Sequence, residues 1–113
     1  MKKLLYITAF PPNKKSGGQV YSINAINDLS KKYMVDVVYF EYKNHDVWPS
    51  LNGKVITKFK PSYLNCIIHP FFYPTFSRRY NGKILDYINH IKLQYDIIYF
   101  DYSQVAIYSL YLE

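Results

Sequence analysis

Near its start the chain reads Lys3-Leu4-Leu5-Tyr6-Ile7-Thr8-Ala9-Phe10-Pro11-Pro12-Asn13-Lys14-Lys15-Ser16-Gly17-Gly18. Its apolar start has the length of a β-strand, and the proline pair ends it because proline continues neither a strand nor a helix. A basic loop and two glycines then lead into a helical pattern from Gln19 to about Tyr33, followed by a second apolar strand over 34–40. Strand, loop, helix and strand form a βαβ unit, whose two strands are parallel.

The rest of the chain extends this unit. We expect a third strand over 54–59 beside the second, short helical pieces and a covering loop over 60–75, a helix over 76–93 and a fourth strand over 96–101. This order predicts an α/β domain, residues 1–113, with a doubly wound, Rossmann-like and mainly parallel sheet of strand order 3-2-1-4. The strand order then reverses between the first and fourth strands, where ligands bind in such sheets.

Composition and charge limit the function classes. Half of the 113 residues are hydrophobic and fourteen are tyrosines, which excludes a disordered chain. The formal net charge of +6 suits anionic partners such as nucleotide diphosphates, phosphorylated lipids or acidic membrane surfaces, although each lysine pair could equally be solubilising surface. We expect no nucleic-acid partner.

Metal and membrane sites are not expected. The single cysteine, Cys66, excludes an intramolecular disulfide, and no Cys/His grouping has the spacing of a zinc site. His45, His69 and His90 do not form a set, and we interpret each as a surface or packed histidine. No apolar run approaches the ~20 residues of a membrane span, so a cytoplasmic protein without metal or cofactor is predicted.

The glycine pair Gly17-Gly18 is the main candidate for a binding site. Glycine lets a phosphate or a sugar hydroxyl approach the backbone closely, and the helix that follows offers free N–H groups with a positive dipole end. The alternative is a glycine needed only where the helix packs on the sheet. Neither GxxxxGK[ST] nor GxGxxG occurs, so the two common nucleotide-binding loops are excluded. Ser16 is the expected helix cap.

A first strand ending in Phe10-Pro11-Pro12, a short polar loop and Gly17-Gly18 resemble the start of retaining glycosyltransferases of the GT-B fold, most closely family four. Residues 95–104 resemble the strand before the acceptor loop of that family, and residues 74–80 are similar to members that build bacterial surface polysaccharides. The resemblance implies donor-phosphate contacts at Ser16, Gly17, Gly18 and Gln19, and an acceptor side formed by Asp101, Tyr102, Ser103, Gln104, Arg78 and Arg79. The histidine of many relatives has no counterpart at Tyr102 or Ser103, so no catalytic residue is assigned.

The same resemblance implies a function for the chain. It would be the truncated, acceptor-binding half of a hexosyltransferase-type enzyme that moves a sugar from a nucleotide sugar to a saccharide or lipid-linked acceptor. The donor domain would lie outside these residues, and this half alone would be inactive. We also expect peripheral contact with the inner face of a membrane, and self-association through the fourth strand or by exchange of the last helix. The alternative is a stand-alone flavodoxin-like binding or regulatory module.

Overall fold

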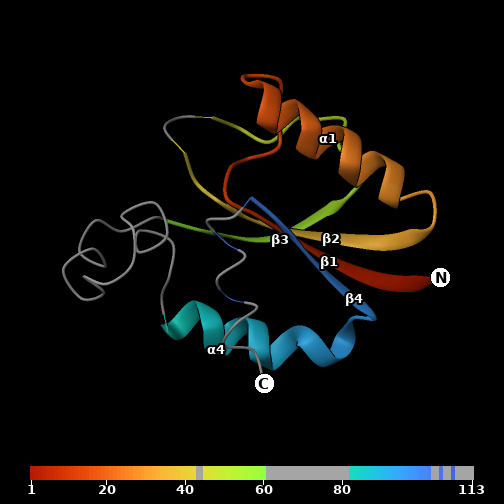
Figure 1. Cartoon of the computed structure of the whole chain (residues 1–113), viewed down its shortest axis with the longest axis vertical. Helices are drawn as coiled ribbons and strands as arrows, with labels where there is room; N and C mark the ends of the chain where they lie inside the picture. Colours follow the sequence, from red (N-terminus) through yellow and green to blue (C-terminus); the bar gives the residue numbers. More distant parts are fainter. Residues whose placement is uncertain (43–44, 61–81, 103–104, 106–107, 109–113) are drawn as a thin grey trace.

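The computed structural model describes residues 1–42, 45–60, 82–102, 105 and 108. Its centre is a four-stranded sheet built from β1 (Lys2–Thr8), β2 (Tyr33–Phe40), β3 (Lys54–Phe59) and β4 (Ile97–Asp101) (Figure 1). All strand pairs are parallel and the order is β3-β2-β1-β4. The predicted Rossmann-like α/β fold and its strand order are therefore confirmed.

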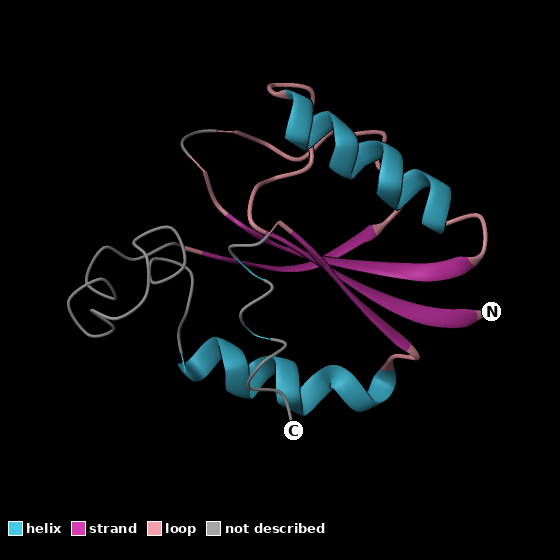
Figure 2. Ribbon diagram, in the orientation of Figure 1, coloured by secondary structure: helices cyan, strands magenta, loops and turns pink. Residues whose placement is uncertain are grey.

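Two helices cover opposite faces of this sheet. Figure 2 shows α1 (Gly17–Leu29) above the strands and α4 (Gly82–Ile91), which continues into the short 3-10 helix η1 (Lys92–Gln94), below them. A strand covered on both faces must be apolar on both, which is why the sequence of β1 shows no polar alternation. No helix among the described residues is long and apolar enough to cross a membrane.

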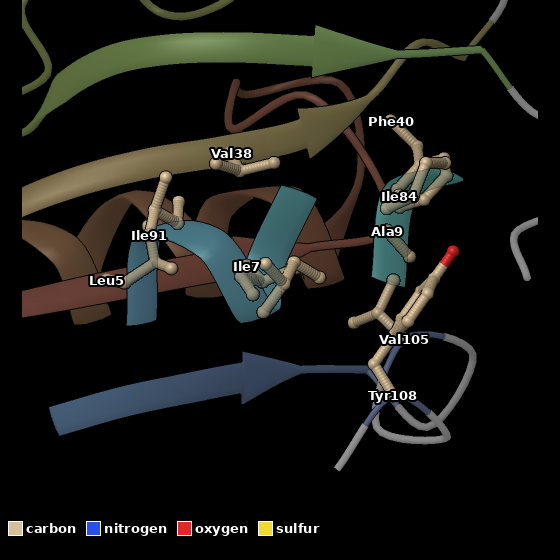
Figure 3. Close-up of a cluster of buried hydrophobic side chains, with 10 residues drawn as sticks. Leu5, Ile7, Ala9, Val38, Phe40, Ile84, Ile91, Val105 and Tyr108 are labelled. Carbon is tan, nitrogen blue, oxygen red and sulfur yellow. The ribbon is translucent and has the colours of Figure 1, made fainter. Parts of the chain in front are cut away.

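The two faces of the sheet have separate cores. Leu4 and Tyr6 of β1 pack with Ile26 on the α1 side, whereas Leu5 and Ile7 belong to the core on the α4 side. Figure 3 shows this second core, in which side chains of β1 and β2 meet those of α4. The helix contributes the three isoleucines at spacings of four and three residues, which place them on one helical face: Ile84, Ile88 and Ile91.

The boundaries of α1 differ from the predicted ones. The glycine pair forms the first turn of the helix instead of a loop before it, and the helix ends at Leu29 with Ser30 as its C-cap. Tyr33, the predicted helix end, is the first residue of β2. The buried helical face is formed by Gln19, Ser22, Ile23 and Ile26, while Tyr21 is 56% exposed. The amino-terminal half of the buried face of α1 is therefore polar, because it consists of Gln19 and Ser22.

Gly53 marks a close approach of the chain to the α1 core. A Cβ atom at this position would lie 2.8 Å from Cγ2 of Ile26 and 2.9 Å from Cγ2 of Val37. The neighbouring Asn52 N–H donates to the side-chain oxygen of Asn27 at 3.0 Å. The end of the connection between β2 and β3 is therefore pressed against α1. Earlier in the same connection, the Trp48 N–H donates to the Pro12 carbonyl of the loop that follows β1.

Several predicted features lie outside the described residues. They include the irregular stretch over 61–75, Cys66, His69, the first residues of the predicted 76–93 helix and the segment after the fourth strand, apart from residues 105 and 108.

Candidate functional site

The loop between β1 and α1 ends at Ser16, which is the N-cap residue of α1. The Ser16 hydroxyl accepts the N–H of Gln19 at 3.3 Å and donates to the side-chain oxygen of Gln19 at 2.9 Å. The cap satisfies one of the N–H groups that a helix start leaves without a partner in the helix. The sequence-based assignment of Ser16 as the cap is confirmed.

Hydrogen bonds of the Gln19 side chain hold this loop in place. Its side chain is buried, and its Nε2 donates to the Pro11 carbonyl at 3.0 Å and lies 3.1 Å from Nδ1 of His45. His45 in turn meets the ring of Tyr42 edge-on at 5.2 Å. Because the Gln19 amide is engaged within the protein, its structural task is to join the β1–α1 loop to the β2–β3 connection.

Asp101, the last residue of β4, is the centre of a buried polar cluster. Its Oδ2 accepts the hydroxyl of Tyr6 and, at 2.5 Å, that of Ser22. The Ser22 hydroxyl also contacts the carbonyl of Gly18 at 3.2 Å. These contacts tie β1, β4 and the first turns of α1 together. Burial, and next the hydrogen bond to Asp101, raise the pKa of Tyr6, which therefore remains a donor.

Tyr102 follows in the left-handed backbone conformation, with φ of 76°. This conformation costs roughly 1–3 kcal/mol in a residue other than glycine. It directs the ring over α1, where a Cβ atom built on Gly18 would lie 3.2 Å from Cζ of Tyr102. Burial, followed by the nearby Asp101 carboxylate, raises the pKa of Tyr102. The missing side chain of Gly18 thus makes room for Tyr102, whereas a Cβ on Gly17 would meet nothing within 4 Å.

A pocket of about 530 Å³ opens beside Tyr102, at the carboxyl ends of the strands. We call it the aromatic pocket, because three aromatic rings form part of its wall. Phe10 meets Tyr42 and Tyr102 edge-on, each with ring centroids 4.9 Å apart. The complete lining consists of Phe10, Lys15, Ser16, Gly18, Gln19, Tyr42, His45 and Tyr102. Its volume is within the ~300–1,000 Å³ of small-molecule sites.

The structure brings together some of the residues selected from the sequence. Ser16, Gly18, Gln19 and Tyr102 line the aromatic pocket, and Asp101 lies in the buried polar cluster next to Tyr102. Gly17 is at the start of α1 but outside the lining. Four further candidates are outside the described residues: Arg78, Arg79, Ser103 and Gln104.

Sequence reasoning missed other residues of the site. His45, interpreted as a surface or packed histidine, is half-buried and lines the pocket with Tyr42. Tyr6 and Ser22 were not selected, although a tyrosine inside an aliphatic strand and a serine on a buried helical face each require a hydrogen-bond partner. This requirement for a partner is the feature of the sequence from which a buried polar cluster could have been predicted. Among the described residues, no group of His, Cys, Asp or Glu could hold a metal ion.

The arrangement offers binding groups of two kinds. Aromatic rings supply apolar contact area, while Lys15 and His45 supply polar groups to the lining. No protein-family model matches the chain, and no curated protein matches it either. The structure therefore establishes a small α/β domain with a four-stranded parallel sheet, and no family.

Proposed function

We propose that the aromatic pocket binds a saccharide and that this chain is the acceptor-side half of a GT-B glycosyltransferase. The observation that carries the proposal is the place of the pocket, at the carboxyl ends of β1 and β4 where the strand order reverses. In open α/β sheets, this is where ligands bind. The Phe-Pro-Pro and Gly-Gly pattern of the β1–α1 loop supplies the link to glycosyltransferases.

The chemistry of the lining favours a saccharide over a wholly apolar ligand. A sugar ring presents C–H groups on its faces and hydroxyl groups around its edge. Aromatic rings such as those of Tyr42 and Tyr102 suit the faces, and Lys15 and His45 suit the hydroxyls. The N–H groups at the start of α1, next to Ser16, would face the phosphates of the donor.

In this proposal the two substrates bind to two different domains. This chain would hold the acceptor, while a second α/β domain would hold the nucleotide sugar, and transfer requires both substrates in line. The chain alone is then expected to bind without catalysing transfer, as one part of a hexosyltransferase-type enzyme. Its net charge of +6 further suits work at the cytoplasmic face of an acidic membrane, on a saccharide or lipid-linked acceptor.

The alternative proposal is a stand-alone flavodoxin-like binding or regulatory module. One observation favours it: apolar side chains of α1 and α4 already cover both faces of the sheet. A domain with both faces covered has the core it needs to fold alone. Codons that follow Glu113 in the gene distinguish the two proposals, because a donor domain with paired glutamates is required by the first alone.

Saccharide binding to the chain itself is the direct test. We expect mono- and disaccharides to shift the NMR signals of Gly18 and His45, and Tyr42→Ala to weaken binding about tenfold through loss of a stacking surface. Tyr21→Ala is the matched control, because Tyr21 is exposed on α1 and outside the pocket lining. Absence of saccharide binding, or equal effects of the two substitutions, would contradict the proposal.

A further inference from the structure

A second pocket, of about 500 Å³, adjoins the aromatic pocket at Lys15, which lines both. It lies between the β1–α1 loop and the β2–β3 connection. We call it the lysine pocket, and the residues of its lining that matter here are Asn13, Lys14, Lys15, Asp46 and Trp48. A ligand that spans Lys15 would therefore occupy both pockets.

The walls of the lysine pocket are fixed by hydrogen bonds between its two loops. Asn13 is buried, its Nδ2 donates to the Asp46 carbonyl at 3.0 Å, and its Oδ1 accepts the N–H of Lys15 at 2.9 Å. The Trp48 N–H donates to the Pro12 carbonyl at 2.7 Å. The loop carrying both lysines is thus held in place before any ligand arrives, which lowers the entropic cost of binding.

The charges of this pocket suit an anion. The Lys14 ammonium lies 4.3 Å from the centroid of the Trp48 ring, a cation–π contact that keeps the charge at the wall. Lys15 is exposed and lines both pockets. Asp46 supplies one opposing carboxylate, so the two lysines leave the lining with a net positive charge. Ammonium groups bind phosphate through charge-assisted hydrogen bonds.

We infer that the natural ligand is a saccharide that carries a phosphate, with its sugar ring in the aromatic pocket and its phosphate between Lys14 and Lys15. The inference rests on the proposed function, since it assigns the sugar to the same pocket. It adds the substrate class: a glycosyl phosphate or phosphodiester, rather than a neutral glycan. A lipid-linked and a soluble ligand share this chemistry.

Calorimetric titration of the chain with glucose 1-phosphate, glucose and inorganic phosphate tests the inference. We expect glucose 1-phosphate to bind at least about tenfold more tightly than either part alone, because a charge-assisted bond is added to the sugar contacts. Lys14→Gln and Lys15→Gln should each remove most of this gain, while glucose binding persists in Lys14→Gln. Lys31→Gln is the matched control, an exposed lysine after the end of α1.

The outcomes separate the two proposals. Equal affinity for glucose and glucose 1-phosphate would overturn the phosphate assignment and leave saccharide binding intact, whereas absence of binding by both sugars would overturn the proposed function as well. An equal loss of affinity in Lys31→Gln would overturn the site, because it would indicate a general effect of charge. Vesicles that contain phosphatidylinositol identify the source of the phosphate, with phosphatidylcholine vesicles as the control. A higher affinity of the chain for phosphatidylinositol vesicles than for glucose 1-phosphate supports a lipid-linked ligand. A lower affinity supports a soluble ligand.

Discussion

The two faces of β1 carry different kinds of side chain. On the α4 side its side chains Leu5 and Ile7 are hydrocarbon, and with Ala9, which follows the strand, they meet a row of isoleucines (Figure 3). On the α1 side the same strand presents Leu4, a tyrosine bonded to Asp101, and its last residue, Thr8. Thr8 is buried, and within the described part of the chain its hydroxyl has no hydrogen-bond partner. We therefore expect the α4 side to contribute more to stability than the α1 side, where polar groups lie beneath the pocket.

The largest effect is expected on the hydrocarbon side. Ile88 is fully buried in the core between α4 and the sheet, so Ile88→Ala should lower the free energy of unfolding by about 2–5 kcal/mol. Urea denaturation followed by circular dichroism measures this loss. A smaller loss of unfolding free energy than that caused by Tyr6→Phe would mean that the α1 side, and not the α4 side, contributes more to stability.

A smaller loss is expected from the polar side. Tyr6→Phe removes one of the two hydroxyls bonded to Oδ2 of the buried Asp101, which should cost about 1–3 kcal/mol of unfolding free energy. Tyr21→Phe serves as the comparison, because it removes a longer and exposed hydroxyl contact, 3.4 Å from the hydroxyl of Tyr99. Equal losses in the two variants would mean that the bond to the buried Asp101 adds no more stability than this exposed contact.

Alkaline pH tests the same hydrogen bond. Since the pKa of Tyr6 is raised in the folded state, its contribution is complete below the ~pH 10 at which an unfolded tyrosine ionises, and it is lost as the pH rises above that value. The hydrogen bond to Tyr21 is the main cause that raises the pKa of Tyr99 to about 12, so Tyr99 adds to the trend. Urea unfolding between pH 8 and 12 should show a shallower decline in Tyr6→Phe than in the unmodified chain.

Thr8→Val is expected to have a smaller effect of opposite sign. Replacing a buried hydroxyl without a partner by a methyl group of similar shape should raise the free energy of unfolding by about 1 kcal/mol. The melting temperature measures this gain. A loss of stability would show that the Thr8 hydroxyl has a stabilising role and would narrow the difference between the two faces.

The smallest change in stability is expected for Gly18→Ala, which should instead alter the pocket. The new Cβ would push the Tyr102 ring away, and we expect saccharide affinity to fall about tenfold while unfolding free energy changes by less than about 1 kcal/mol. Gly17→Ala is the control, since its Cβ would contact nothing. NMR titration of both variants decides the matter. Similar affinities in the two would exclude Tyr102 from the binding surface.

The sheet could be predicted from the sequence because its information is local and repetitive. Four apolar runs of strand length, with a helical pattern in two of the three connections, predict a parallel sheet with the strand order of a doubly wound fold. The end of α1 could not be predicted as well, because Lys31, Lys32 and Tyr33 continue a helical pattern although the chain turns at Ser30. Secondary-structure preferences do not record where a neighbouring strand must begin.

The candidate site was predictable only where topology determines it. The proximity of Gly18 and Tyr102 follows from the strand order, because Tyr102 comes directly after β4 and Gly18 lies in the first turn of the helix that follows the adjacent strand β1. The contributions of Asn13, His45 and Trp48 do not, since they depend on how the β2–β3 connection crosses the β1–α1 loop. That crossing is held by single hydrogen bonds such as the one between Trp48 and Pro12, and such bonds leave no periodic signal in a sequence.

The backbone at Tyr102 has a consequence for the evolution of this protein. With φ of 76°, the position would be more stable as glycine or asparagine, so selection for folding alone favours the replacement of tyrosine there. A tyrosine that persists at this position must be retained for its side chain. Homologues can therefore be sorted by one residue: tyrosine is expected where the pocket is in use, and glycine or asparagine is expected where a lineage has lost its ligand.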